Sequence, residues 1–424
     1  MQLVAYGAQD IYLTGNPQIT FFKVVYRRHT NFAVESIEQT FNGTADFGKR
    51  VTATISRNGD LIQQMYLEVD LPVVETPGST SNVWTYGVGN ALVKQAEIEI
   101  GGQLIDRQYG DWMNIWTELT IPAGKRDGYD NMVGNDVDGG DANIQTGGLT
   151  STEVRRLYVP LQFWFNRNPG LALPLIALQY HEVKLNLELR PMNQLINFEI
   201  GLIPAATGTF GCKLYVDYIY LDTDERRRFA QVSHEYLIEQ VQFTGSESVA
   251  ATATTKNVTL NFNHPVKELV WVNNSTTFGA SNTATGNRWF NYGDSNDTTD
   301  TFTKGLLQLN GHDRFSVRNA DYFRKVQNFE HHCRVPRVGS DLHVSDSKLT
   351  KRQQFIYSYS FALSPEEHQP SGTCNFSRID NAVLQLTYVP TSITTRDAYN
   401  LNVYAVNYNV LRIMSGMGGL AYSN

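Results

Sequence analysis

Two glycine-rich segments have spacings found in nucleotide-binding loops. Segment 43–50 (GTADFGKR) has the glycines and lysine of a phosphate-binding loop, but Arg50 stands where that motif needs Ser or Thr. It also leads into a predicted strand, whereas phosphate binding requires a helix N-terminus. Segment 416–421 (GMGGLA) has dinucleotide-fingerprint spacing without room for the helix that must follow. We interpret the first as a hairpin turn and the second as a flexible tail after the last strand.

Side chains that could hold a metal occur in two places. His331, His332 and Cys333 are adjacent, and neighbouring histidines in an extended segment point apart, so they do not form a zinc site. Asp136, Asp138 and Asp141 lie in a glycine-rich segment that lacks the terminal Glu of a calcium loop, and we interpret it as a solvated acidic loop. No nucleophile elbow or Ser/His/Asp trio can be assigned. We therefore expect no metal, no cofactor and no enzymatic activity.

Composition restricts the remaining function classes. The 424 residues include 35 Lys and Arg against 42 Asp and Glu, a net charge of −7, which argues against direct nucleic-acid binding. Three cysteines (Cys212, Cys333 and Cys374) give no disulfide framework. We expect no signal peptide in residues 1–15 and no transmembrane segment, because the longest strongly apolar stretch, residues 171–178, is too short to span a bilayer.

Short runs with period-two alternation dominate the chain and predict β-strands. Examples are 51–56 (VTATIS), 96–101 (AEIEIG), 183–189 (VKLNLEL), 383–388 (VLQLTY) and 401–406 (LNVYAV). Many such runs separated by turn residues indicate an all-β sandwich or barrel. Helices are predicted only over 111–119, 223–230 and 319–325, and long loops over 123–151, 273–303 and 329–351.

An internal duplication organises these strands. Segment 37–39 (IEQ) recurs at 238–240, 99–103 (EIGGQ) is matched by 308–312 (QLNGH), and 216–221 (VDYIYL) by 406–411 (VNYNVL). The matches keep their order at a spacing of about 200 residues, which indicates a copied domain. We predict an all-β fold of two tandem eight-stranded jelly rolls, a double jelly roll, with short connecting helices. The domains would span 30–221 and 235–424, joined by a linker helix over 222–234. A single large sandwich is the alternative.

Several longer segments resemble one protein family. They are 12–33 (YLTGNPQITFFKVVYRRHTNFA), 55–61 (ISRNGDL), 165–183 (FNRNPGLALPLIALQYHEV), 370–381 (PSGTCNFSRIDN) and 407–422 (NYNVLRIMSGMGGLAY). Spread over the whole chain, they resemble major capsid proteins of nucleocytoplasmic large DNA viruses, and most closely the chlorovirus type from algal viruses.

The resemblance implies a structural protein of the virion capsid. We expect a homotrimer whose six similar domains form a pseudo-hexagonal capsomer that tiles an icosahedral shell, assembled in the host cytoplasm. Neighbouring capsomers and minor capsid proteins under the shell would be partners, and residues 1–29 would form an extension at the capsid base. Asn282, in the context SNTAT, is the candidate for a covalent glycan.

Two other classes remain open. A β-sandwich carbohydrate-binding or adhesion protein would share this architecture, and its candidate surfaces are the aromatic segments 84–86 (WTY) and 288–292 (RWFNY). A glycoside hydrolase needs two carboxylates that flank a cleft, and the sequence nominates no such pair.

Overall fold

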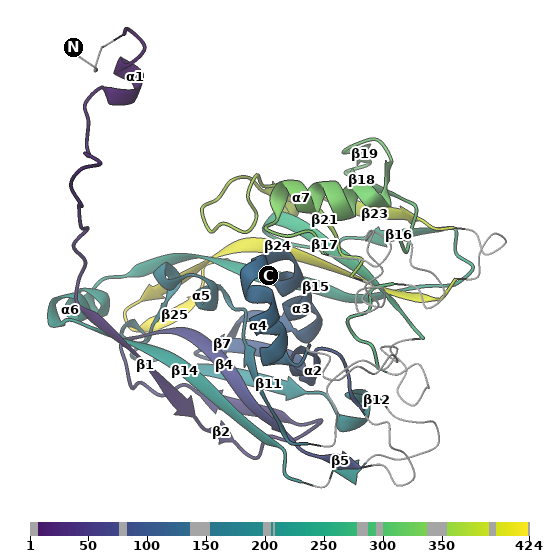
Figure 1. Ribbon diagram of the computed structural model, residues 1–424, viewed down its shortest axis with the longest axis horizontal. Coiled ribbons are helices and arrows are strands. Elements are labelled where there is room, and N and C mark those ends of the chain that lie inside the picture. The colour runs from purple at the N-terminus through teal and green to yellow at the C-terminus, as the bar shows by residue number, and fades with distance from the viewer. Residues whose placement is uncertain are drawn as a thin grey trace.

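The computed structural model describes residues 7–75, 83–135, 153–197, 205–206, 208–277, 287–293, 300–336, 354–389 and 396–422. The chain forms two β-sandwiches, side by side in Figure 1, with the first at lower left and the second at upper right. Within the described ranges no helix is long and apolar enough to cross a membrane.

The first sandwich is built from two five-stranded sheets. One has the order β1-β14-β4-β10 with β9 paired to β4, and the other has the order β2-β3-β11-β7-β8. Their strands are β1 (Phe32–Gln39), β2 (Phe41–Asn42), β3 (Arg50–Thr54), β4 (Leu61–Leu71), β7 (Val93–Ile100), β8 (Gln103–Tyr109), β9 (Arg155–Pro160), β10 (Leu173–Pro174), β11 (Val183–Leu189) and β14 (Gly211–Leu221). Two small pairs join β5 (Val74–Glu75) to β13 (Ala205–Ala206) and β6 (Val83–Trp84) to β12 (Ile196–Asn197).

The second sandwich repeats this plan. A six-stranded sheet has the order β15-β24-β17-β21, with β22 paired to β17 and β25 to β24, and a five-stranded sheet has the order β16-β23-β18-β19, with β20 paired to β18. The strands are β15 (His234–Val249), β16 (Thr255–Thr259), β17 (Pro265–Ser275), β18 (Lys304–Leu309), β19 (His312–Asp313), β20 (Arg318–Asn319), β21 (Tyr357–Ser360), β22 (Cys374–Asn375), β23 (Ala382–Thr387), β24 (Tyr399–Met414) and β25 (Met417–Leu420). Several two-residue strands at sheet margins bring each sandwich above the eight strands expected.

The duplicated segments occupy corresponding positions. Strand β1 pairs antiparallel with β14, and β15 pairs in the same way with β24, so each sandwich joins its first long strand to its last. Alternation places one side of each strand in the core: Met65, Leu67 and Val69 of β4 are at most 1% exposed, while the residues between them are half-buried. Because both sandwiches share one continuous apolar cluster, they are packed against each other.

The helices agree with the sequence in three places. Helix α3 (Gly110–Thr120) and helix α6 (Thr223–Gln231) lie where predicted, and the third prediction corresponds to a π-helical turn, η5 (Tyr322–Val326), that continues into α7 (Gln327–His331). Asp222 caps α6 by accepting a hydrogen bond from the backbone N–H of Thr223 at 2.8 Å. The other short helices are α1 (Ile11–Thr14), α2 (Val88–Leu92), α5 (Trp164–Arg167), η2 (Pro169–Leu171), η3 (Leu175–Ala177), η4 (Met192–Gln194) and η7 (Phe376–Arg378).

The prediction of a loop over 123–151 is wrong for its first part, because α4 covers Ala123–Val133. Two glycines lower the intrinsic helix propensity of this segment. Tertiary contacts compensate: the buried guanidinium of Arg126 donates to Glu118 of α3 and, at 3.0 Å, to Asp130. Gly134 ends the helix with φ +77°, a conformation that glycine adopts without steric penalty.

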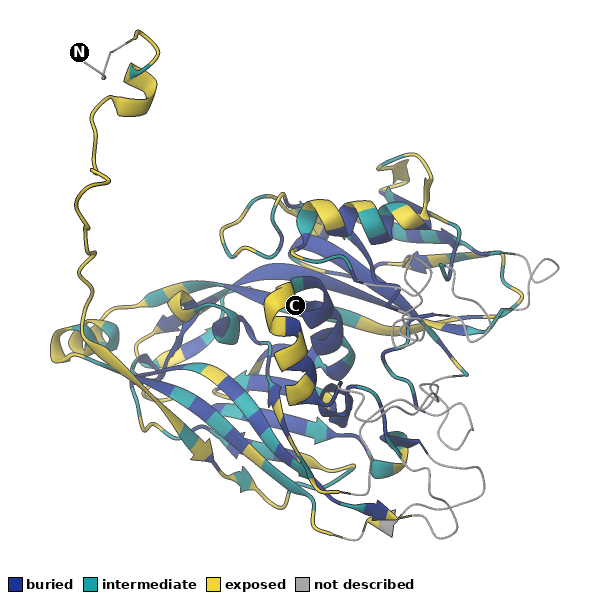
Figure 2. Ribbon diagram, in the orientation of Figure 1, coloured by how far each residue is buried: buried dark blue, intermediate teal, exposed yellow. Residues whose placement is uncertain are grey.

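The segment before β1 stands away from both sandwiches. Figure 1 shows it leaving beside α6 and running outward, and Figure 2 shows it exposed along its described length. We call residues 7–31 the arm. All of them except Asp10 are exposed, so the arm adds nothing to the core of its own chain.

Candidate functional site at the junction of the two sandwiches

Both glycine-rich motifs lie in β-hairpins. Segment 43–50 links β2 to β3, which pair antiparallel, so its interpretation as a hairpin turn is confirmed. The interpretation of segment 416–421 as a flexible tail is wrong. Residues Met417–Leu420 form β25, which folds back on β24 through a turn at Ser415 and Gly416, with φ +52° and +80°.

The His331-His332-Cys333 cluster holds side chains in different directions, as expected. The His331 ring lies 3.0 Å from the carbonyl oxygen of Leu363, whereas the His332 ring lies between two carboxylates, with Nε2 3.1 Å from Glu268 and Nδ1 3.0 Å from Glu366. No group of three potential metal ligands occurs among the described residues. Asp136, Asp138, Asp141 and the glycosylation candidate Asn282 lie outside the described residues.

Three of the rings in the aromatic segments proposed as carbohydrate-binding surfaces are buried. Trp84 and Tyr292 have no exposed area and Phe290 is 2% exposed. They are buried because residues 287–292 of the second half insert against the first. Sugar binding by stacking needs accessible ring faces, so this prediction is wrong for these three rings.

That insertion forms one end of the junction between the sandwiches. The side-chain amide of Asn287 donates to the carbonyl oxygens of Asn193 and Ile196 at 2.9 and 3.0 Å. The indole N–H of Trp289 donates to Gln194 at 2.8 Å. The acceptors are backbone carbonyl groups of the first sandwich. These hydrogen bonds therefore set the position of residues 287–292 and also hold the two sandwiches together.

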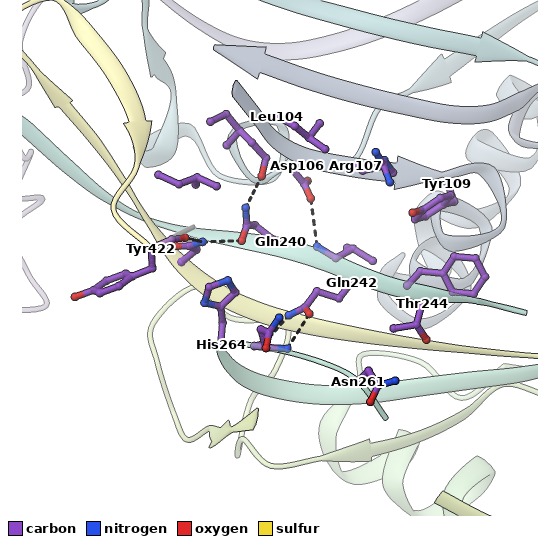
Figure 3. Close-up of a pocket in the computed structure, with 16 residues that line it drawn as sticks. Leu104, Asp106, Arg107, Tyr109, Gln240, Gln242, Thr244, Asn261, His264 and Tyr422 are labelled. Carbon is purple, nitrogen blue, oxygen red and sulfur yellow. Dashed lines mark hydrogen bonds between the residues drawn. The ribbon is translucent and has the colours of Figure 1, made fainter. Parts of the chain in front are cut away.

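The middle of the junction is a seam between β8 and β15 (Figure 3). A carboxylate oxygen of Asp106 accepts from the backbone N–H of Val241 at 3.2 Å, and the other accepts from Gln108 at 2.8 Å. The side-chain amide of Gln240 donates to the carbonyl oxygen of Ile105. Burial raises the pKa of Asp106 to about 6 despite these bonds. A polar cavity of about 300 Å³ opens beside the seam.

A buried ion cluster surrounds Glu239 of β15. Its carboxylate lies 2.8 Å from the Lys267 ammonium and 3.3 Å from the guanidinium of Arg167, which comes from α5 of the first sandwich. Burial alone would raise the pKa of Glu239, but His368 and the two cations lower it to about 2. Arg167 also stacks over the Trp116 ring with 4.1 Å to its centroid. The cluster therefore joins the two halves, because moving the sandwiches apart would leave these buried charges without their partners.

The hairpin of β24 and β25 closes the other end of the junction. The backbone N–H of Tyr180 donates to Gly416 at 3.0 Å, and Nδ1 of His181 lies 3.0 Å from the carbonyl oxygen of Gly418. A Cβ on Gly418 would lie 2.6 Å from Leu178, so only glycine lets the hairpin approach this closely. We call this contact the hairpin clasp.

The junction is arranged to hold two domains at one orientation, and its polar groups are engaged with one another. Sequence reasoning missed it, although one signal was present. Lys267 and Glu268 are adjacent charges inside the apolar run of β17, and such charges are rarely buried unless they are paired. The partner of each could not be read from the sequence.

Comparisons with known proteins agree along the whole chain. The family model for the major capsid protein N-terminus matches residues 20–222, and that for the large eukaryotic DNA virus major capsid protein matches residues 225–345 and 348–419. The chain is 54% identical over 432 residues to the major capsid protein of Pyramimonas orientalis virus, covering 100% of this chain and 99% of that protein. It is 46% identical over 465 residues to the major capsid protein of Paramecium bursaria Chlorella virus 1, with the same coverage.

Solved structures give the same result. A chain of the quasi-atomic model of the PBCV-1 virus capsid matches with a TM-score of 0.78 at 42% identity, covering 96% of this chain and 100% of that one. The Faustovirus major capsid protein matches with a TM-score of 0.70 at 13% identity, covering 96% and 94%, which supports the fold alone. The chain therefore belongs to the family of major capsid proteins of large eukaryotic DNA viruses, and its two sandwiches are a double jelly roll.

Proposed function

We propose that this capsid protein acts as a homotrimer in which three chains present six similar sandwiches around one axis. The junction carries this proposal. Its ion cluster, seam and hairpin clasp hold the two sandwiches of a chain in one arrangement, which a block of nearly hexagonal outline requires. Closed three-fold association of such chains uses one heterologous interface repeated three times.

The remaining assignments follow from this role. Residues 30–221 and 235–424 are the two jelly rolls, 222–234 the linker helix, and 1–29 an extension at the capsid base. Neighbouring capsomers and minor capsid proteins are the partners, the protein has no catalytic role, and assembly takes place in the host cytoplasm. The sheets support this division, because their strands come from 32–221 and from 234–420.

Size-exclusion chromatography with light scattering tests the trimer. We expect a stable species near three times the 47.8 kDa chain mass. A matched pair of variants tests the part played by the junction: Arg167→Ala removes a cation shared between the sandwiches, and Arg412→Ala removes one from an exposed pair with Glu235. Only the first should reduce the trimer fraction. A monomer at all protein concentrations would overturn the proposal.

We also propose that Asn282 carries a covalent glycan, on the strength of its SNTAT context. An intact mass above that of the bare chain, reduced to the bare value by Asn282→Gln, would support it. A virion-derived chain with the bare mass would overturn it.

A further inference from the structure

The arm has an unusual composition for an exposed segment. Phe21, Phe22 and Tyr26 are 91%, 99% and 84% exposed, and Val24 and Val25 are 72% and 66% exposed. Residues 16–31 also contain two arginines and one lysine but no acidic residue, in a chain of net charge −7. Among the described residues, no hydrogen bond or ion pair joins the arm to either sandwich. Large apolar side chains that remain this exposed indicate a partner surface.

A surface with complementary properties lies on the outer side of the β1-β14-β4-β9 sheet. Its centre is a row of tyrosines: the Tyr215 and Tyr66 rings stack with centroids 5.3 Å apart, and the Tyr66 and Tyr158 centroids are 6.2 Å apart. Tyr66 and Tyr215 are half-buried and Tyr158 is exposed. On each strand, the two residues that flank the tyrosine in sequence are buried in the core. We call this surface the tyrosine face.

Carboxylates surround this row. Glu38 of β1, Glu68 of β4 and Asp217 of β14 lie on the same side of the sheet as the tyrosines. The ammonium of Lys213 lies 3.7 Å from Glu38. Neither Glu68 nor Asp217 has an ion-pair partner among the described residues. Asp70, on the same side of β4, pairs with Arg156 of β9 at 2.7 Å. The tyrosine face therefore keeps an excess of negative charge around partly exposed aromatic rings, which suits arginine and lysine side chains.

A mostly apolar cavity of about 510 Å³ adjoins the row. Its lining consists of Met65, Tyr66, Met132, Tyr158, Pro160 and Leu161 together with the polar residues Gln64, Gln162 and Asn166. A phenylalanine side chain fits the chemistry of this lining, because its burial removes a large apolar area from water and needs no hydrogen-bond partner. The tyrosine face and the cavity together offer the apolar and anionic contacts that the arm does not make with the sandwiches of its own chain.

We propose that the tyrosine face and its cavity bind the arm of a second copy of this chain. Phe21 or Phe22 occupies the cavity, and the cationic side chains of Lys23, Arg27 and Arg28 lie over the tyrosines and their carboxylates. The direction of the arm favours another copy, because it leaves beside α6 and runs outward from its own sheet (Figure 1). Residues 22–31 link Phe22 to β1 and span roughly 33 Å when extended, so Phe22 can lie far outside its own sheet. This inference rests on the self-association proposed above.

Disulfide trapping between two differently tagged, full-length populations tests the proposal. Cys333, the exposed cysteine among the three, is replaced by serine in both. One population carries Phe22→Cys and the other Tyr158→Cys, and they are co-expressed and oxidised mildly. Thr259→Cys, exposed on β16 of the second sandwich, replaces Tyr158→Cys in the matched control. We expect a disulfide-linked pair bearing both tags, with a yield at least about tenfold above the control, because docking raises the effective concentration.

Charge reversal adds a second readout. Arg27→Glu with Arg28→Glu should lower the yield of the linked pair, and Glu68→Arg in the partner should restore part of it. A yield equal to that of Thr259→Cys, which is also the result expected if each arm binds its own chain, or no response to charge reversal would each overturn the inference. Light scattering on the same samples separates the two proposals: a trimer without the specific link refutes the arm site alone, whereas monomers without a link refute both.

Discussion

The buried triad of His332, Glu268 and Glu366 predicts a specific pH dependence of stability. The side chains of His332 and Glu268 have no exposed area, and the ring lies within 3.1 Å of both carboxylates. Burial by itself would lower the pKa of His332, but the charge of Glu268 and the bonds to both carboxylates raise it to about 9. The folded protein thus binds a proton that the unfolded chain releases near pH 6.5.

The magnitude follows from linkage. A folded-state pKa raised from 6.5 to about 9 contributes roughly 3 kcal/mol to the free energy of unfolding, at about 1.36 kcal/mol for each pH unit between the two values. This contribution is fully present below pH 6.5 and is lost as the pH rises through 9. Less than about 0.5 kcal/mol remains near pH 9.

Urea unfolding at pH 6.5, 7.5 and 9 measures this contribution. Glu268→Gln removes the charge that contributes most to raising the pKa, so we expect a lower free energy of unfolding at pH 6.5 and little further loss up to pH 9. His312→Gln, at an exposed histidine of β19, is the control and should keep the wild-type slope. Parallel pH dependences for the wild-type protein and Glu268→Gln would refute the reasoning.

Three further changes test the junction. Gly418→Val overlaps buried Leu178 and should cost roughly 1–3 kcal/mol, seen as a lower thermal midpoint, while Met417→Ala on the exposed side of the hairpin should change little. Asp106→Asn should stabilise by up to about 3 kcal/mol at pH 8 but not at pH 4, because the raised pKa penalises the charged carboxylate above about 6; equal effects at both values would contradict this. Glu239→Gln should lower the free energy of unfolding by about 3 kcal/mol at pH 7 and leave it nearly unchanged near pH 2. The reason is that the lowered pKa of Glu239 contributes stability above pH 4.5, and this contribution disappears as the pH falls through about 2. Urea midpoints of variant and wild type that differ equally at both pH values would contradict this.

The fold could be predicted because its signals are local or repeated. In strands such as β4 and β11, the alternation of apolar and polar residues predicts directly which side of the strand is buried. The copied segments 37–39 and 238–240 indicate two domains, and the structure places them in corresponding strands, β1 and β15. The cap of α6 is equally local, since Asp222 bonds to the next residue.

The junction could not be predicted, because it depends on contacts between distant segments. Gly418 reads as part of a flexible tail until Leu178 and His181 are seen beside it. The sequence predicts that Trp289 lies at the surface, but in the structure its indole N–H donates a hydrogen bond to the carbonyl oxygen of Gln194. Helix α4 was missed for the same reason, since its low propensity is offset by a salt bridge to another helix.

The pairing of first with last long strands has a consequence for how the chain acquires its structure. Strand β24 bonds to β15 over fourteen positions despite the long sequence separation between them, and β14 closes onto β1 in the same way. Such distant pairings carry a loop-closure entropy cost before any stabilising contact forms, which slows folding. During synthesis the early half can complete its sheet independently, whereas β15 pairs with β24 and must wait for this partner until residues 399–414 have left the ribosome. Interrupted translation therefore yields chains with an unpaired strand, and such unpaired edges favour aggregation.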